Sequence, residues 1–348
     1  MGLIHDIQYV VKDIKENSDK LCEHRPKNKL LVQADMLGCL FQYRVHGFEY
    51  YQLGFDCIPR SERKNYMTTH RVAMANKILN DPGSNNLLTN KFYAGTVLAP
   101  FYKRPCIQNI GLSYEDFLAF IQGRDRFIFK PIAGFGGEGH VVYKTNDGRS
   151  PEEMYAEILA SPRGVLEGWI VQHETLNRLY KDAVHTIRLH TIHDGSGRDV
   201  KVFGGNLSIA FGGELANTHY ATTICCQVDD DTGVITTDGL QRDTNTIYTE
   251  IPVTRVKLRG FQLPDWEETL ELVKNAAATV PEIQFIGWDV AWTPDGPVIC
   301  EGNVFPGVVN YQNYAWYADG YAVGWWPLVK SYIDKKQHTR TDCEELVP

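Results

Sequence analysis

The sequence predicts an α+β protein built from several lobes, not a regular alternation of strands and helices. Residues 1 to about 85 show helical spacing of apolar side chains, as in Ile4, Ile7, Val11 and Ile14. The remainder mixes helices with strands and then becomes rich in strands. Segregated runs of this kind are typical of α+β folds, and 348 residues provide enough chain for two or three hydrophobic cores.

Turn signals in the sequence suggest three regions. Asp81-Pro82-Gly83, followed by polar residues, interrupts a helical pattern and is the strongest boundary signal. We expect a helical region over residues 1–85, a mixed region over 86–175 and a strand-rich region over 176–348.

The elements of the mixed region follow from caps and apolar runs. Ser113 and Ser150 each precede an acidic residue three positions later, which predicts helix starts at both. Buried strands are expected at 126–130, 141–144 and 168–172, with a glycine-rich loop over 134–140.

The strand-rich region contains three long β-patterns, over 183–193, 200–213 and 221–228. A helix after Asp265 and a hairpin over 285–303 follow, and a last helix is expected around 321–336.

Composition limits the classes of function. A formal net charge of −8 argues against nonspecific nucleic-acid binding. No apolar run is long enough to span a membrane, and the amphipathic N-terminus does not resemble a signal peptide. The eight cysteines show no C-x-x-C spacing and are read as free thiols, so we expect a cytoplasmic protein.

The hairpin Phe285–Gly307 carries polar residues where its pattern otherwise predicts core. Pro294-Asp295-Gly296 is a turn signal. If Thr293 pairs with Pro297, Asp289 lies directly opposite Glu301, and Asn303 shares the face of Glu301 because side chains alternate.

Three converging oxygen donors suit Mg²⁺ or Mn²⁺ rather than zinc. Because Mg²⁺ rarely has a complete protein shell, substrate phosphates are expected to complete this one. A solvated hairpin face with acids by chance is the alternative. Zinc on His185, His190 and His193 is disfavoured, since these residues do not share one face of a strand.

A glycine loop is the candidate site for those phosphates. Gly134, Gly136 and Gly139 satisfy G-x-G-x-x-G, but a strand follows the loop where a dinucleotide-binding or P-loop fold has a helix. The protein-kinase pattern is also incomplete, because H-R-D and D-F-G are missing. Two interpretations remain. The segment is either a β-hairpin loop that covers a triphosphate, with Lys130 as a nearby charge, or a plain surface hairpin.

Two further features lie between the loop and the hairpin. The strand ending in Gln172-His173-Glu174 is either a nucleotide hinge or a plain strand end. Arg188, in the middle of a β-pattern, needs an anionic partner, which is either a substrate group or a protein carboxylate.

This order of features resembles the ATP-grasp superfamily. The segments FIFKPIAGFGGEGH and FIGWDVAWTPDGPVICEGN most resemble its sugar-transfer-associated group. The resemblance covers roughly residues 90–307 and implies two α+β lobes that clasp ATP, one over 86–175 with the glycine loop as a lid and one over 176–348 with the metal site.

The resemblance also implies roles for individual residues. Arg188 would stabilise an acyl phosphate, and Asp289, Glu301 and Asn303 would hold two Mg²⁺, with Mn²⁺ possible. The residues that would contact ATP are Lys91, Lys130, Gly134, Gly136, Gly137, Gly139, Val171, Gln172, His173 and Glu174. His173 and Asn90 both stand where relatives more often carry an acid.

The implied activity is biosynthetic carboxylate–amine ligation through an acyl phosphate, with release of ADP and phosphate. Substrates would be an amino acid, a peptide or a sugar-linked carboxylate with an amine, and a homodimer is possible. A phosphotransferase acting on a hydroxyl and a catalytically silent nucleotide-binding partner are the alternatives.

Overall fold

The computed structural model describes residues 3–132, 138–212, 223–241, 244, 246–313 and 324–344. The chain forms two compact units, one made of Met1–Leu79 with Phe305–Pro348 and the other of Asn80–Val304. Chain that follows the last strand therefore belongs with the N-terminal helices. The sequence-based division at residues 85 and 175 remains a prediction.

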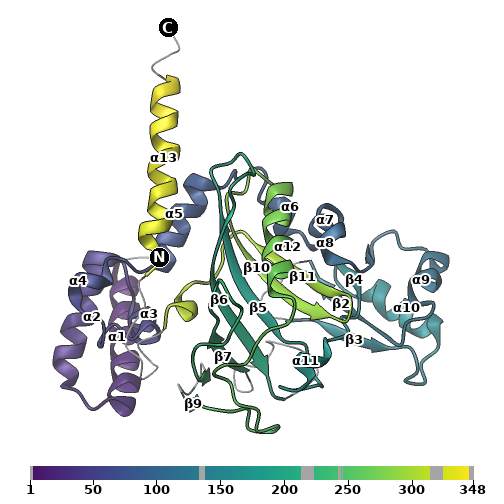
Figure 1. Cartoon of the computed structure of the whole chain (residues 1–348), viewed down its shortest axis with the longest axis horizontal. Helices are drawn as coiled ribbons and strands as arrows, with labels where there is room; N and C mark the ends of the chain where they lie inside the picture. Colours follow the sequence, from purple (N-terminus) through teal and green to yellow (C-terminus); the bar gives the residue numbers. More distant parts are fainter. Residues whose placement is uncertain are drawn as a thin grey trace. The chain divides into compact units, whose positions relative to one another are not determined.

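The first unit is helical (Figure 1). Its elements are α1 (Leu3–His24), α2 (Lys29–Tyr43), α3 (Gly47–Leu53), α4 (Arg60–Arg63), α5 (Thr69–Leu79), the 3-10 helix η2 (Val309–Tyr311) and α13 (Trp326–Glu344). Helix α1 packs against α2 and α3, and α13 packs against α5. The Gln312 side chain accepts from the backbone N–H of Met67 and donates to its carbonyl, which fixes the returning chain.

One expectation for this unit is confirmed and another needs correction. The helical pattern of α1 is confirmed, but Ile7 and Val11 are 55% and 61% exposed, so its apolar stripe is only partly buried. The last helix extends to Glu344 instead of ending near residue 336. The expected start of this helix, residues 321–323, lies outside the described residues.

The second unit contains a four-stranded antiparallel sheet in the order β1-β4-β2-β3. Its strands are β1 (Cys106–Gln108), β2 (Arg126–Pro131), β3 (Val141–Lys144) and β4 (Gly164–Gly168). Helices α9 (Tyr114–Ile121) and α10 (Pro151–Ala160) begin at the predicted caps, Ser113 and Ser150. They cover one face around Phe117, Phe127 and Phe129, and Lys130 lies on the other face because side chains alternate.

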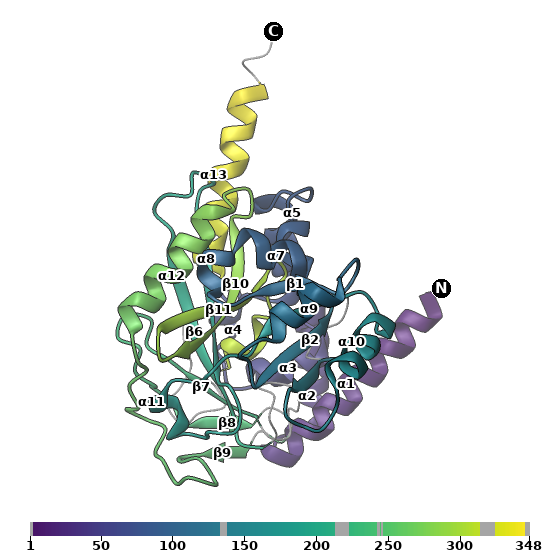
Figure 2. The same ribbon diagram turned by 90° about the vertical axis from the view of Figure 1, so that its right-hand side faces the viewer.

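A seven-stranded sheet follows in the order β11-β10-β5-β6-β7-β8-β9. Its strands β7, β8 and β9 can be followed toward the bottom of the view in Figure 2. Its strands are β5 (Thr186–Ile192), β6 (Lys201–Ala210), β7 (Thr223–Gln227), β8 (Gly239–Gln241), β9 (Thr246–Tyr248), β10 (Phe285–Thr293) and β11 (Gly296–Asn303). Helix α12 (Trp266–Thr279) packs on one face, where Trp288 and Trp292 are fully buried. The opposite face carries the polar residues described below.

Short helices connect these parts: α6 (Asn86–Thr89), α7 (Lys91–Val97), α8 (Ala99–Tyr102) and α11 (Glu174–Asn177). The strand expected at 168–172 is wrong, because β4 ends at Gly168. The buried strand is the preceding Gly-Val-Leu-Glu-Gly, and residues 169–173 leave the sheet toward α11.

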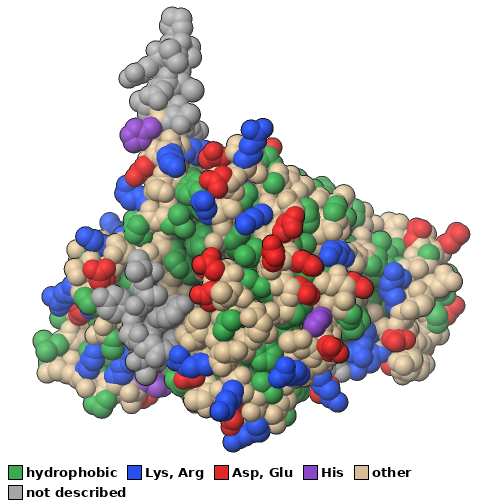
Figure 3. Space-filling view, viewed as in Figure 1, with side chains coloured by type: hydrophobic (Ala, Val, Ile, Leu, Met, Phe, Trp, Pro, Cys, Tyr) green, Lys and Arg blue, Asp and Glu red, His purple; other side chains and the backbone are tan. Residues whose placement is uncertain are grey.

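Acidic and basic side chains are interspersed on the face shown in Figure 3. Among the described residues, no helix is both long enough and apolar enough to cross a lipid bilayer. Seven of the cysteines are free thiols: Cys22, Cys39, Cys57, Cys106, Cys225, Cys226 and Cys300.

Candidate nucleotide and metal site

The β10–β11 hairpin brings two predicted metal ligands together. Asp289 pairs directly with Glu301, which confirms the predicted register at this point. The assumed pair of Thr293 with Pro297 is wrong, because Thr293 pairs with Gly296. Gly296 has a φ of +93°, a left-handed conformation that closes this tight turn. The turn is thus one residue shorter than expected.

One extra residue in β11, Cys300, reconciles the shorter turn with the predicted pair. The pairs on either side of Cys300 differ in register by one residue, which defines a β-bulge. Because side chains alternate along a strand, β11 without the bulge would turn Glu301 and Asn303 to the face covered by α12. The bulge therefore places both residues on the face of Asp289.

Arg188 lies opposite Asp289, on β5, and holds its carboxylate. The guanidinium Nε is 2.6 Å from Asp289 Oδ1, and Nη2 is 2.9 Å from Oδ2. Asn303 Nδ2 donates to Oδ2 at 3.3 Å. The sequence left the partner of Arg188 open between a substrate anion and a protein carboxylate. The structure pairs it with a carboxylate that is itself a predicted metal ligand.

Lys91 faces Glu301 from the first turn of α7, with Nζ 3.9 Å from Oε1. Asn90 caps α7 by accepting from two backbone N–H groups, so it performs the role that an acid would have there. Burial and the nearby charge of Asp289 raise the pKa of the Glu301 carboxyl. A lysine at a helix N-terminus opposes the helix dipole, and the nearby Glu301 carboxylate offsets that cost.

Lys130 belongs to a buried charge network that was not predicted. Its Nζ is 2.8 Å from Glu167 Oε2, and Arg104 donates to the same oxygen from Nη2 at 2.7 Å. Burial alone would raise the pKa of Glu167, but the two cations outweigh it and lower that pKa to about 2. A charged residue within the apolar strand Gly164–Gly168 was the available signal, by the reasoning already applied to Arg188.

The described end of the glycine loop lies close to the lysines. Gly139 has a φ of +72°, and a Cβ there would meet Pro131 Cγ at 2.9 Å, so glycine is required. Burial, with the charges of Lys130 and Lys91, lowers the pKa of His140 to about 4. His140 was not singled out from the sequence. Gly134, Gly136 and Gly137 lie outside the described residues.

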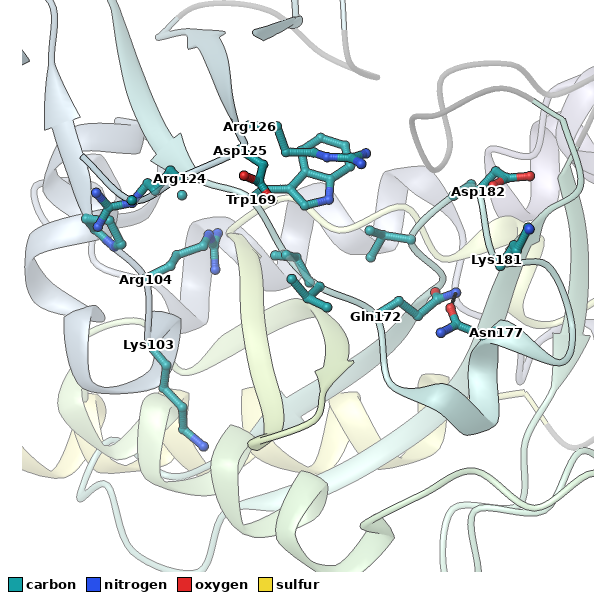
Figure 4. Close-up of a pocket in the computed structure, with 17 residues that line it drawn as sticks. Lys103, Arg104, Arg124, Asp125, Arg126, Trp169, Gln172, Asn177, Lys181 and Asp182 are labelled. Atoms are coloured by element: carbon teal, nitrogen blue, oxygen red, sulfur yellow. Dashed lines mark hydrogen bonds between the residues drawn. The ribbon is translucent and has the colours of Figure 1, made fainter. Parts of the chain in front are cut away.

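The predicted hinge, Val171 to Glu174, borders a cavity of about 730 Å³ (Figure 4). Val171 and Gln172 line it, together with the basic residues Lys103, Arg104, Arg124, Arg126 and Lys181. The guanidinium carbon Cζ of Arg126 lies over the Trp169 ring, 5.2 Å from its centroid.

The hinge is also bonded to the rest of the protein. The backbone N–H of His173 donates to Trp292 O at 2.8 Å, at the end of β10. The side chain of Gln172 bonds Asn177 and the backbone of Tyr180 and His185. Glu174 is exposed and begins α11. Contact of these four residues with a nucleotide remains a prediction.

The polar face continues beyond Arg188 along one row of the sheet. Asn206 pairs with Arg188, and Gln227 pairs with Asn206, so all three point to the same side. Asn206 and Gln227 are 0% and 1% exposed. Among the described residues, neither amide atom of Asn206 has a hydrogen-bond partner. Such a buried, unsatisfied group is uncommon in a folded protein and needs an explanation.

The donor set fits a magnesium ion shared with phosphates. Asp289, Glu301 and Asn303 offer oxygen ligands from neighbouring positions on one face. In the described part of the chain, no group of three or more His, Cys, Asp or Glu residues could hold a metal without such help. An Mg²⁺ here would therefore depend on substrate oxygens.

Comparison with known proteins identifies the family. The sequence profile described as sugar-transfer associated ATP-grasp matches residues 103–314, which is more than half of the chain. The chain belongs to this family, and the predicted ATP-grasp fold is confirmed. Among curated proteins, none matches the sequence.

Solved structures with similar folds include other ATP-grasp proteins. The ligase PsnB, complexed with a variant of its minimal precursor, Mg and ADP, has a TM-score of 0.42 at 14% identity, covering 74% of this chain and 61% of PsnB. The D-alanine-D-alanine ligase from Coxiella burnetii also has a TM-score of 0.42 at 14% identity, covering 77% and 64%. At these values the similarities decide nothing about substrate.

Proposed function

We propose that this protein is an ATP-dependent carboxylate–amine ligase. Membership of the ATP-grasp family supports the use of ATP. The observation that carries the proposal is the row Glu301, Asp289 and Arg188, with Lys91 beside it. Two carboxylates, an arginine and a lysine in contact suit a reaction in which phosphoryl charge must be held and neutralised.

In the first half of the proposed reaction, a carboxylate oxygen of the substrate attacks the γ-phosphorus of ATP. The bond between that phosphorus and the β–γ bridging oxygen breaks, ADP leaves and an acyl phosphate forms. Lys130 and Lys91 would hold phosphate oxygens, and Arg188 would hold the acyl phosphate. Mg²⁺ bound by Asp289, Glu301 and Asn303 would supply charge neutralisation and orientation.

In the second half, the amine nitrogen of the second substrate attacks the acyl carbon. The carbon–oxygen bond to phosphate breaks, the nitrogen loses one proton to solvent and an amide forms. The sum of the two steps joins acid and amine with loss of one water, while ATP becomes ADP and phosphate. Arg188 would stabilise the negative charge that develops on the acyl oxygen.

The row of polar residues supports a proposed position for the acid. Neighbouring strands are about 4.8 Å apart, so Asn206, two strands from Asp289, lies about 10 Å from it across the sheet. An acid with its carboxylate at Arg188 would extend over Asn206. A hydroxyl or amide on that acid would satisfy both the donor and the acceptor of the Asn206 side chain, once the groups that cover this buried amide move aside on binding.

The experiment that tests this function is a substrate matrix. Release of ADP and phosphate from Mg²⁺-ATP is measured with amino acids, peptides and sugar-linked acids, each with and without amines. Products are identified by mass. The Asp289→Asn variant is the control for contaminating ATPases.

Release that requires both an acid and an amine, with a product lighter than their sum by one water, is the expected result. ADP release with a hydroxyl acceptor and a phosphorylated product would identify a phosphotransferase instead. ATP binding without turnover under any condition would favour a silent nucleotide-binding protein.

A further inference from the structure

Arg104 connects the two sheets of the second unit. Its side chain is 6% exposed, and its nitrogens make five hydrogen bonds. On the four-stranded sheet it donates to Glu167 from Nε at 3.0 Å and from Nη2 at 2.7 Å. On the seven-stranded sheet it donates to the carbonyls of Ile299 at 2.7 Å and Cys300 at 3.4 Å.

The two carbonyls belong to consecutive residues at the bulge of β11. In a regular strand, successive carbonyls point to opposite sides, so one guanidinium does not reach both. Only a local distortion turns them toward the same partner. A bulge also leaves backbone groups without ladder partners, which are costly when buried. Arg104 supplies donors to these carbonyls at the position of the extra residue.

The side on which Glu301 lies depends on this bulge, as the pairing shows. Glu301 follows Cys300 directly, and its pairing with Asp289 exists only because the register shifts there. If the extra residue were absorbed back into the ladder, Glu301 would face the core and would no longer lie beside Asp289. Stabilising the bulge therefore stabilises the predicted metal site.

The same arginine is linked to Lys130 through a shared carboxylate. Glu167 Oε2 accepts from Lys130 at 2.8 Å and from Arg104 at 2.7 Å, so one carboxylate oxygen joins the lysine to the arginine. The predicted phosphate contact and the predicted metal ligand are thus linked through two buried side chains. Neither Arg104 nor Glu167 has to touch a substrate for this link to operate.

We infer that Arg104 is a positioning residue, which holds the Ile299–Cys300 bulge and thereby keeps Glu301 on the metal-binding face. The consequence for metal binding rests on the proposed function, whereas the effect on the bulge does not.

The test compares Arg104→Lys with wild type. Lysine keeps the positive charge beside Glu167 but lacks the planar fork that reaches two carbonyls. Arg149→Lys is the control, because Arg149 also donates from Nε and Nη2 to one carboxylate oxygen, that of Asp147, but is more exposed and bonds no residue of the predicted site. Arg104→Gln, which leaves Glu167 paired with Lys130, is the second variant if Arg104→Lys does not fold.

Two measurements are made on each protein. Amide hydrogen exchange over residues 296–303 of the nucleotide-free protein reports the bulge. Mn²⁺ titration in the presence of a non-hydrolysable ATP analogue reports the metal site. We expect faster exchange and about tenfold weaker Mn²⁺ binding in Arg104→Lys, a loss typical of residues that orient ligands.

If Arg104→Lys matches Arg149→Lys in both its amide exchange rates and its Mn²⁺ affinity, the inference is overturned. Faster exchange with unchanged Mn²⁺ affinity would overturn its second half, since the bulge would then not govern Glu301. A wild-type protein that binds no Mn²⁺ would contradict the metal site of the proposed function, and hydrogen exchange would still decide whether Arg104 holds the bulge.

Discussion

Arg188 and Asp289 lie directly opposite each other on neighbouring strands, and the guanidinium contacts both oxygens of the carboxylate, at 2.6 and 2.9 Å. A cation bound to Asp289 must therefore share that carboxylate with Arg188 or displace it. Arg188 therefore competes for a predicted metal ligand, and the proposed function gives it a second role, in which it holds a phosphorylated substrate.

Replacing Arg188 with methionine is expected to lower turnover by about 100-fold, as removal of a single transition-state donor does. Mn²⁺ affinity should not fall, since the competitor for Asp289 is gone. Steady-state kinetics and Mn²⁺ titration check the two effects. A parallel loss of metal binding and turnover would show that Arg188 only holds Asp289 in place.

Glu301→Gln should abolish most ATP turnover while leaving the fold intact. The side chain is 45% exposed and its pairing with Lys91 is long, at 3.9 Å, so stability should change by less than about 0.5 kcal/mol. Turnover and urea unfolding are measured together, with Glu250→Gln as control. Normal turnover in Glu301→Gln would exclude this residue as a metal ligand.

Glu167→Gln should be strongly destabilising, by about 3–5 kcal/mol, because Arg104 and Lys130 then lose their buried counter-ion. The pKa of Glu167 is lowered to about 2 in the folded protein. Its stabilisation is therefore complete above about pH 4.5 and is lost as the pH falls toward 2. Urea unfolding at several pH values should show the wild type approaching the variant over that range, and a constant difference would contradict the ion network.

The His140 ring should report the binding of phosphates near Lys130 and Lys91. Its pKa of about 4 reflects burial and the charges of Lys130 and Lys91. A bound ATP analogue should raise this pKa, because phosphate charges oppose those of the lysines. Folding stability should also decline as the pH falls from about 6.5 toward 4, where only the unfolded chain binds the proton. NMR titration of the His140 ring tests both, and Lys130→Met should raise the pKa without nucleotide.

Asn206→Leu should make the folded protein as stable as wild type or more stable, since the lost amide has no partner among the described residues. The same change should raise the KM for the acid substrate. Asn109→Leu is the control, because Asn109 uses both ends of its amide, accepting from Gly164 and donating to Ile158, and should be destabilised. An unchanged KM in Asn206→Leu would remove Asn206 from the proposed acid site.

The sequence predicted the hairpin pair for a partly wrong reason. Alternation and the turn at Pro294-Asp295-Gly296 placed Asp289 opposite Glu301, which the structure confirms. The assumed turn was one residue too long, and the bulge that compensates has no local sequence signal. Ile-Cys fits a regular strand as well as a bulge. The side chain that bonds the carbonyls at the bulge is Arg104, nearly 200 residues earlier in the chain.

Other parts of the site were open to prediction in different degrees. The mid-strand charge that singled out Arg188 is present equally in Glu167, and the same physical reasoning applies to it. The register of β6, which brings Asn206 beside Arg188, depends on pairing that local patterns do not define. Cytoplasmic location, a homodimer and the ATP contacts of individual residues stay predictions.

The bulge in β11 makes the function of this hairpin sensitive to the parity of its length. Inserting or deleting one residue between the turn and Glu301 exchanges the two faces of the strand beyond that point, whereas a change of two residues restores them. Natural and engineered variants of this segment should therefore differ in length by even numbers, or should gain or lose the bulge at the same time. The face of the sheet on which Glu301 and Asn303 lie therefore depends on the extra residue at Cys300.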